Sequence, residues 1–241
     1  MQLSDAPNTI DDDGSVHIWR IQIPKTLDLG QTAPLSTAEQ ARLAKMANAS
    51  MRRLFLHVHR AKREILARYL NVSAKELALR ETEFGKPMLD SSMPAALEFN
   101  ISHTANMAVM AVSQIPVGVD LESAERRVNV LALARRYFDS ATLNHIADLD
   151  ETHQSKLFLR YWTQLEAYKK ATGLGLRGGD QSLKMATAST PNLFEPFADP
   201  NLADHWLVAE LDVIPDHALS VVIPHRPGYS ASLQVFEYQP D

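Results

Sequence analysis

The chain has 241 residues, of which 45% are hydrophobic and 22% are charged, with a net charge of −5 and no cysteine. This composition indicates a well-packed globular protein of one large or two small domains, and the negative charge argues against nucleic-acid and membrane-surface partners. The lack of cysteine excludes disulfides, a thiol nucleophile and thiolate metal sites. The polar, acidic start is unlike a targeting peptide, and no apolar run reaches the roughly 18 residues of a membrane span, so we expect a cytoplasmic protein.

The first half of the chain is predicted to combine strands with long helices. The alternation in VHIWRIQI (16–23) predicts a strand that ends at Pro24. Residues 36–70 have apolar residues at helical spacings and predict one long helix or two shorter ones, with Ser36 or Thr37 as the N-cap. The following segments are predicted, in order, as a short helix or turn (73–79), a Gly/Pro-punctuated loop (84–89) and two strands (97–102 and 106–112).

Residues 117–122, VGVDLE, predict a strand with two unlike faces. Successive strand residues point to opposite sides, so Val117, Val119 and Leu121 would face a core. Gly118, Asp120 and Glu122 would then share the other face. Two neighbouring carboxylates raise each other's proton affinity unless a positive charge lies between them. The face is therefore either simply solvated or a binding site for a cation.

The remaining elements repeat the mixture of strands and helices. The turn SQIP (113–116) predicts a β-hairpin between 106–112 and 117–122, and it is also the expected seam between two halves of the chain. Residues 129–138 and 155–173 predict helices, the second with an apolar stripe and with Gly173 as its C-cap. Three strand-like runs follow, at 205–213, 217–224 and 231–238.

Several polar groups could carry chemistry, and each also has an ordinary structural interpretation. Glu166 and Lys170 are four residues apart on the predicted helix, which is typical of a surface ion pair. Together with Asp120 and Glu122, however, Glu166 would complete a set of hard oxygen ligands that suits Mg²⁺ better than zinc. Ser102 and His103 end a strand, where they form either a solvated turn or part of a site.

A basic run provides a further candidate site. Arginines and lysines crowd residues 52–68 of an otherwise acidic chain, which indicates either a solvated helix face or a site for a polyanion. Lys86, which follows Gly85 in a restricted loop, could add another cation.

Other motif matches lack their required context. GLGLRG (173–178) has the spacing of a dinucleotide-binding motif but follows a helix instead of a strand. Ser102, His103 and Asp120 do not indicate a hydrolase triad, because there is no nucleophile elbow and adjacent strand residues point in opposite directions. His57 and His59 alone do not indicate zinc.

The succession FGKP, FNISHT, VGVDLE and WTQLEAYKKATGLGL resembles the 4′-phosphopantetheinyl transferase superfamily, in its monomeric surfactin-synthetase-activator (Sfp) type. The resemblance spans roughly Val16 to Leu176 and rests on the order of the motifs. It implies an α+β pseudo-dimer of two similar subdomains, with the active site in the cleft between them. We expect residues 1–115 to form the subdomain on the nucleotide side of coenzyme A, and residues 116–241 to form the subdomain that carries the metal-binding carboxylates.

The resemblance also implies a reaction and a set of site residues. The 4′-phosphopantetheine arm of coenzyme A would be transferred to a serine of an apo acyl or peptidyl carrier protein, leaving adenosine 3′,5′-bisphosphate. Asp120, Glu122 and Glu166 would hold Mg²⁺, and Glu166 would also take the proton of the carrier serine. Glu166, Lys170 and His103 form the expected catalytic set. The residues expected to contact coenzyme A are Arg52, Arg63, Lys86, Ser102, His103 and Lys170.

Apart from basic positions upstream of Arg63, which help hold the 3′-phosphate in relatives and do not line up here, the chain departs from the family pattern at two single residues. Leu165 stands where relatives usually have lysine, and Thr142 stands where many relatives have a glutamate proposed as general base. These departures leave open a non-catalytic relative that binds coenzyme A or a carrier protein. We expect a monomer, because one chain supplies both halves of the cleft.

Overall fold

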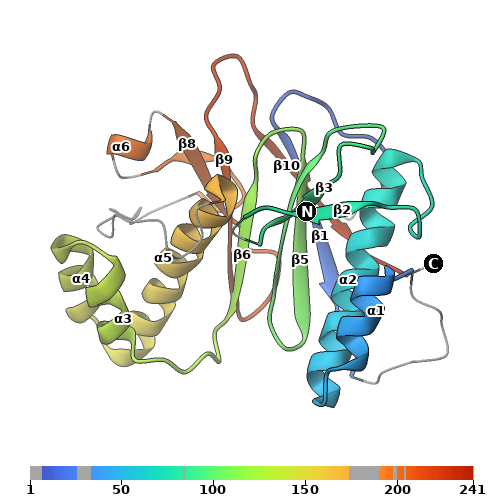
Figure 1. Cartoon of the computed structure of the whole chain (residues 1–241). Helices are drawn as coiled ribbons and strands as arrows, with labels where there is room; N and C mark the ends of the chain where they lie inside the picture. Colours follow the sequence, from blue (N-terminus) through green and yellow to red (C-terminus); the bar gives the residue numbers. More distant parts are fainter. Residues whose placement is uncertain are drawn as a thin grey trace.

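Two four-stranded sheets that pack face to face form the centre of the molecule (Figure 1). The computed structural model describes residues 7–25, 34–83, 85–173, 190–197, 200–203 and 205–240, and every structural statement below concerns these residues. The first sheet has the order β10 (Ser232–Glu237), β1 (Ser15–Gln22), β5 (Met107–Ser113) and β4 (Glu98–His103). The second has the order β6 (Gly118–Ser123), β9 (His217–Pro224), β8 (Trp206–Glu210) and β7 (Glu195–Pro196).

Each sheet carries one 22-residue helix on its outer face (Figure 1). Helix α2 (Ala49–Leu70) packs on the first sheet, and α5 (Glu151–Thr172) packs on the second. The smaller elements are α1 (Thr37–Ala44), α3 (Val130–Tyr137), α4 (Ser140–Ala147), α6 (Pro200–Ala203) and the hairpin of β2 (Leu79–Glu81) with β3 (Pro87–Leu89). The predicted α+β fold of two similar halves is therefore confirmed.

Strand alternation builds this layered core. Val16 and Ile18 of β1 meet Val119 and Leu121 of β6 between the two sheets. The alternate residues of the first sheet, such as Trp19, pack against α2 on the other side. Because each sheet buries both faces, burying apolar side chains holds four layers together.

Local sequence signals define the helix ends. Ser36 caps α1 with a full capping box, in which its side chain accepts from Glu39 N and Glu39 accepts from Ser36 N. Asn48 caps α2, so residues 36–70 form two helices. Gly173 ends α5 in the left-handed region at φ 73°, as its position predicted.

Three predicted features of the strands need correction. The β5–β6 hairpin was wrong, because β1 and β4 occupy both edges of β5 and β6 pairs with β9 instead. The predicted loop 84–89 contains β3, which pairs with β2. Strand β10 pairs with β1, so it belongs to the first sheet although it follows the predicted seam at residue 116.

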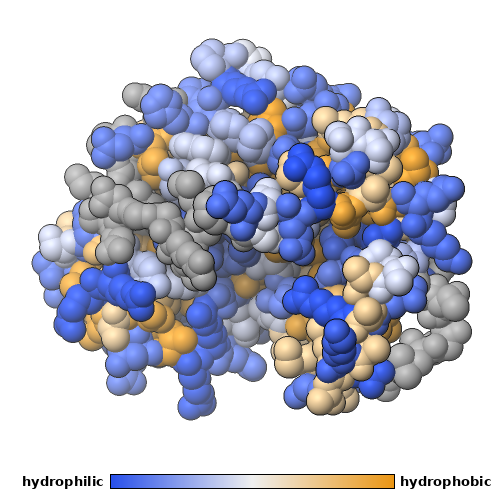
Figure 2. All heavy atoms as spheres, viewed as in Figure 1, coloured by the Kyte–Doolittle hydropathy of each residue, from blue (hydrophilic) through white to orange (hydrophobic). Residues whose placement is uncertain are grey.

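Hydrophilic side chains cover most of the face shown in Figure 2, with smaller apolar patches between them. Within the described parts of the chain, no helix combines the length and apolar character that crossing a bilayer requires. The glycine motif at 173–178 lies, after Gly173, outside the described residues.

Candidate functional site

Close packing of α5 on β6 creates the candidate site. Gly118 lies directly under α5, where a Cβ atom would be 1.9 Å from the Ala167 carbonyl oxygen and 2.5 Å from the Ala171 nitrogen. Asp120 and Glu122 share the face of Gly118, because they alternate with it along β6. The absence of a side chain at Gly118 therefore lets the helix bring Glu166 and Lys170 to the two β6 carboxylates.

Asp120 lies at the centre of the polar contacts. Its side chain is almost fully buried, and its Oδ1 accepts from Lys170 Nζ at 2.7 Å and from Ser102 Oγ at 2.9 Å. Lys170 Nζ also donates to the Val119 carbonyl at 3.1 Å. Strands β4 and β6 and helix α5 thus converge on one carboxylate.

Two carboxylate oxygens in this centre are buried without a hydrogen-bond partner: Asp120 Oδ2 and Glu166 Oε1. Burial, followed by the negative charge of Asp120, raises the pKa of Glu166 above its ordinary value. The same two causes raise the pKa of Glu122, against the opposing charge of Arg126. An unpartnered buried oxygen is costly, so this excess of negative charge favours a cation at the site.

Glu122 differs from the other two carboxylates because, among the described residues, neither of its oxygens is buried without a hydrogen-bond partner. Arg126, four residues later, forms an ion pair with Glu122 Oε1 and lies over the Trp162 ring, 5.4 Å from its centroid. Sequence reasoning missed Arg126, although its i+4 spacing from Glu122 was a usable signal. Glu122 can therefore act as a metal ligand only with an oxygen that Arg126 leaves free.

Side chains of β4 bind the outer edge of β6 and join the two sheets. Asn100 Oδ1 accepts from Val119 N at 3.0 Å, and Ser102 Oγ accepts from Leu121 N at 3.2 Å. Asn100 and Ser102 alternate on β4 and therefore point to the same side. Ser102 thus positions Asp120 and its strand; its predicted contact with coenzyme A stays a prediction. Asn100 is part of the FNISHT motif in the sequence, but no role was predicted for it.

Replacing Asn100 with Ala is expected to destabilise the protein by about 1–3 kcal/mol, because the buried Val119 N–H loses its acceptor. Urea denaturation measures the free energy of unfolding directly. As the matched control, Asn106→Ala changes an exposed asparagine in the turn after β4 and should stay within about 0.5 kcal/mol of the wild type. Equal stability of the two variants would contradict the role of the Asn100 hydrogen bond in holding the two sheets together.

His103 ends β4 with an exposed side chain. Desolvation by the surrounding protein, followed by the positive charge of Lys170, lowers its pKa, and the charges of His59 and Asp120 also act on it. Its predicted contact with coenzyme A stays a prediction.

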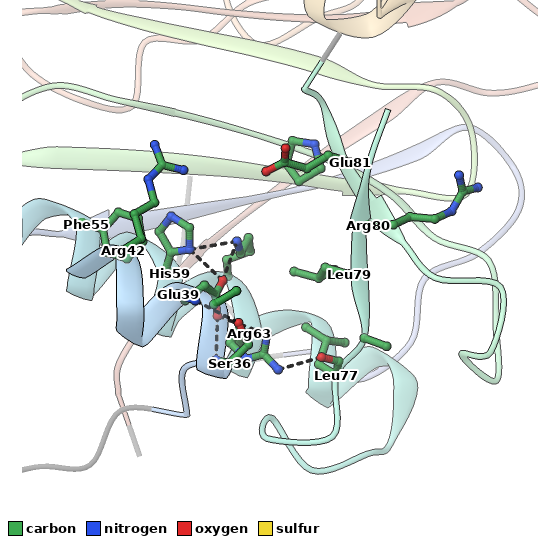
Figure 3. Close-up of a pocket in the computed structure, with 14 residues that line it drawn as sticks. Ser36, Glu39, Arg42, Phe55, His59, Arg63, Leu77, Leu79, Arg80 and Glu81 are labelled. Carbon is green, nitrogen blue, oxygen red and sulfur yellow. Dashed lines mark hydrogen bonds and ion pairs between the residues drawn. The ribbon is translucent and has the colours of Figure 1, made fainter. Parts of the chain in front are cut away.

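A pocket of about 450 Å³ lies between α1, α2 and the β2–β3 hairpin, and we call it the α1–α2 pocket (Figure 3). Its polar lining consists of Ser36, Glu39, Arg42, His59, Lys62, Arg63, Arg80 and Glu81. Arg42 lies over Phe55, which stacks on His59 with 3.8 Å between ring centroids. The pocket thus offers an aromatic surface beside a group of charges, a combination suited to a nucleotide.

Arg63, one of the residues expected to contact coenzyme A, lines the pocket but has its donors directed at acceptors within the protein. The side chain is only 2% exposed, and it donates to the carbonyls of Ala74, Lys75 and Leu77 as well as to Glu39. Arg63 therefore fastens the turn at residues 74–77 to α2. Its predicted contact with coenzyme A stays a prediction.

The other predicted cations lie nearer the surface. Lys86, beside the pocket at the start of β3, is 3.9 Å from Glu98, and burial lowers its pKa against the charge of that glutamate. Arg52 lies in the first turn of α2, and its buried Nε has no hydrogen-bond partner. Neither position tests the predicted contact with coenzyme A, and both contacts stay predictions.

The two departures from the family pattern are buried residues. Leu165 packs in an apolar cluster that joins α3, α4 and α5, so the apolar stripe explains a leucine there. Thr142 lies buried in the first turn of α4, where its backbone N–H donates to the Asp139 cap.

Comparisons with known proteins agree over both halves of the chain. Residues 116–222 match the family model described as 4′-phosphopantetheinyl transferase superfamily, and residues 24–115 match the one described as 4′-phosphopantetheinyl transferase, N-terminal. The chain is 34% identical to the 4′-phosphopantetheinyl transferase HetI of Nostoc sp., over 83% of each chain. It is 27% identical to the 4′-phosphopantetheinyl transferase Sfp of Bacillus subtilis, over 59% of this chain and 67% of the relative.

A search of solved structures found the holo-[acyl-carrier-protein] synthase of Thermotoga maritima, with a TM-score of 0.34 and 16% identity. The match covers 46% of this chain and 64% of that chain.

Proposed function

Since the chain belongs to the 4′-phosphopantetheinyl transferase superfamily, we propose that it transfers the 4′-phosphopantetheine arm of coenzyme A to a serine of an apo acyl or peptidyl carrier protein, in a Mg²⁺-dependent reaction. The observation that carries this proposal is the pair of buried, unpartnered oxygens on Asp120 and Glu166 beside Lys170. The serine oxygen would bond to the phosphorus that carries the arm, and adenosine 3′,5′-bisphosphate would leave.

The chemical type of the available ligand atoms supports a magnesium ion. Within the described ranges, no group of three or more His, Cys, Asp or Glu side chains is already arranged to hold a metal ion. Asp120 Oδ2 and Glu166 Oε1 are nevertheless hard oxygen donors without a hydrogen-bond partner, which is the chemistry that Mg²⁺ prefers. We assign these two oxygens as ligands, with Glu122 as the third. When bound, the ion would neutralise charge on the diphosphate of coenzyme A.

The protein's own residues would perform the remaining steps. Lys170, already directed at Asp120, would bind the same diphosphate as a fixed positive charge. We also assign Glu166 the proton of the carrier serine, as the family resemblance implies. His103 ends β4, where the charge of Lys170 acts on it, and we assign it a contact with the phosphates of coenzyme A.

The two halves of the chain would have different roles in binding and catalysis. We propose that residues 1–115 hold the nucleotide in the α1–α2 pocket, with Lys86 at its side and Arg52 in the neighbouring turn of α2. Residues 116–241 would supply the carboxylates. Strand β10 is the exception to this division of the chain, because it follows residue 116 but belongs to the first sheet. Because a single chain contributes both halves, we propose that the enzyme acts as a monomer.

Incubating the protein with coenzyme A, magnesium and a panel of apo carrier proteins tests the reaction, with intact mass of the carrier as the readout. A carrier that gains one phosphopantetheine group supports the proposal, and a chelator should prevent the gain until magnesium is restored. Unchanged transfer with the metal removed would contradict the magnesium assignment. Coenzyme A or carrier binding without transfer to any carrier would instead favour a non-catalytic relative.

A further inference from the structure

Arg126 is tied to the strand that carries two of the carboxylates. The chain turns back directly after β6, where the Arg126 backbone N–H donates to the Ser123 carbonyl at 3.0 Å. The Ala124 N–H anchors the same turn by donating to the Asp216 carbonyl at 2.8 Å. This turn returns the Arg126 side chain to Glu122, where Nη1 forms an ion pair with Oε1. A positive charge therefore lies on one oxygen of an assigned metal ligand.

An aromatic ring holds the guanidinium group of Arg126 in that position. The guanidinium carbon lies over the Trp162 ring, 5.4 Å from its centroid. Trp162 is buried and packs against Tyr137 and Phe158, with ring centroids 5.1 and 5.6 Å away. A cation that contacts both an aromatic face and a carboxylate gains from both interactions. Arg126 is therefore fixed at the carboxylate centre, although its side chain is 31% exposed.

The protein supplies its own positive charges to the carboxylate centre. The cations whose charges act on Glu166 include Lys170, Lys169 and Arg126. The charges of Arg126 and Lys170 act on Glu122 as well. A divalent cation that enters the centre gains from the carboxylates but is repelled by these cations. Arg126 adds a further cost, because the ion must share the Glu122 carboxylate with a guanidinium group.

The diphosphate of coenzyme A would change this balance. Mg²⁺ is usually bound by one or two carboxylates together with substrate phosphates, and it keeps several of its waters. Asp120 Oδ2 and Glu166 Oε1 are two such carboxylate oxygens without a hydrogen-bond partner. The diphosphate would add oxygen ligands, and its negative charge would offset the charge of Arg126. A divalent cation therefore gains a much stronger site when coenzyme A is present.

We propose that Arg126 keeps the metal affinity of the free enzyme low and so makes Mg²⁺ binding depend on coenzyme A. The inference rests on the proposed function and on the assignment of Glu122 as a ligand. Arg126 acts through Glu122 and through the charge of the centre, so it is a positioning residue that does not contact the reacting atoms. By linkage, the ion strengthens binding of coenzyme A by the same factor by which coenzyme A strengthens binding of the ion.

Mn²⁺ is the probe for the metal affinity of the free enzyme, because it binds to the same oxygen ligands as Mg²⁺ and its unbound form is counted by electron paramagnetic resonance. Arg126→Gln should bind Mn²⁺ about tenfold more tightly than the wild type, since one positive charge leaves the centre. Arg127→Gln, at the exposed arginine that follows, is the matched control for net charge and should stay within about twofold. Unchanged or weaker Mn²⁺ binding by a folded Arg126→Gln protein would overturn the inference.

Arg126→Lys separates the charge of the side chain from its shape. Lysine keeps a positive charge beside Glu122 but lacks the planar fork of donors. Its Mn²⁺ affinity should therefore stay within about threefold of the wild type. If Arg126→Lys tightened Mn²⁺ binding as much as Arg126→Gln does, loss of the arginine shape would be the cause and the electrostatic explanation would be wrong.

The wild-type protein tests the coupling without any substitution. Calorimetric titration with coenzyme A should give a dissociation constant about 30-fold lower with magnesium than with a chelator. In Arg126→Gln this ratio should fall to about threefold, because the ion no longer depends on the diphosphate to offset the arginine. Equal affinity for coenzyme A with and without magnesium in the wild type would overturn the inference.

The carrier mass assay judges the transferase proposal separately from these titrations. Magnesium-dependent modification of a carrier, together with equal Mn²⁺ affinity in Arg126→Gln and the wild type, would overturn the inference alone. Tighter Mn²⁺ binding by Arg126→Gln, without modification of any carrier, would support the role of Arg126 at the centre and contradict the proposed reaction.

Discussion

Asp120→Asn should lower kcat/KM for phosphopantetheine transfer by about 10³-fold or more, because it removes the charge on which the whole centre converges. In the wild type, Asp120 accepts from Lys170 and Ser102, and its second oxygen is one of the two free donors for a cation. Asparagine keeps the shape but binds a divalent cation far more weakly than a carboxylate does. Transfer assays over a range of magnesium concentrations measure the effect.

The same variant should keep its fold. Removing the charge of Asp120 also relieves repulsion on Glu122 and Glu166, so we expect a Tm within a few degrees of the wild type. Asp150→Asn is the matched control: Asp150 is the exposed N-cap of α5, and asparagine caps helices equally well. If Asp120→Asn retained more than about a tenth of wild-type kcat/KM at saturating magnesium, the proposed metal centre would be wrong.

Gly118→Ala should cost about 3 kcal/mol or more of unfolding free energy and abolish transfer. The added Cβ would lie 1.9 Å from the Ala167 carbonyl oxygen and 2.5 Å from the Ala171 nitrogen. Both are backbone atoms within α5, so no side-chain rotation relieves the clash and the helix must move away from β6. Because Glu166 and Lys170 lie on that helix, the displacement would also separate them from Asp120.

Thermal and urea denaturation of Gly118→Ala measure the first effect, and the carrier mass assay measures the second. Ser123→Ala, at the other end of β6, is the control and should change stability by less than about 1 kcal/mol. A Gly118→Ala protein with wild-type stability would show that α5 does not depend on this close approach.

Local sequence patterns predicted much of the candidate site. Alternation along residues 117–122 placed Asp120 and Glu122 on the face opposite the core valines, and the structure has this arrangement. Helical spacing placed Glu166 and Lys170 one turn apart, and Gly173 ended the helix as expected. These features follow from the periods of strands and helices and from the backbone freedom of glycine, which depend on neighbouring residues alone.

Strand pairing was less predictable, because it depends on which edges remain free in the folded chain. The turn at 113–116 satisfied the pattern of a hairpin, but β1 and β4 already occupy both edges of β5. Strand β6 therefore pairs with β9, about a hundred residues later in the sequence, and its other edge is bound by side chains of β4. No local sequence pattern indicates that β6 pairs with β9 instead of β5.

The sequence by itself determined most of the longer strands and the two long helices, their buried faces, the family and the acidic residues that could bind a cation. The tertiary structure alone decided which charges are free and which are already matched. Arg63 belonged to a plausible anion-binding run in the sequence, yet backbone carbonyls and Glu39 use its donors in the fold. Asp120 and Glu166 keep one unpartnered oxygen each. The physical reason is that hydrogen-bond partners and burial come from residues distant in the sequence, so the charge available to a ligand exists only once the chain has folded.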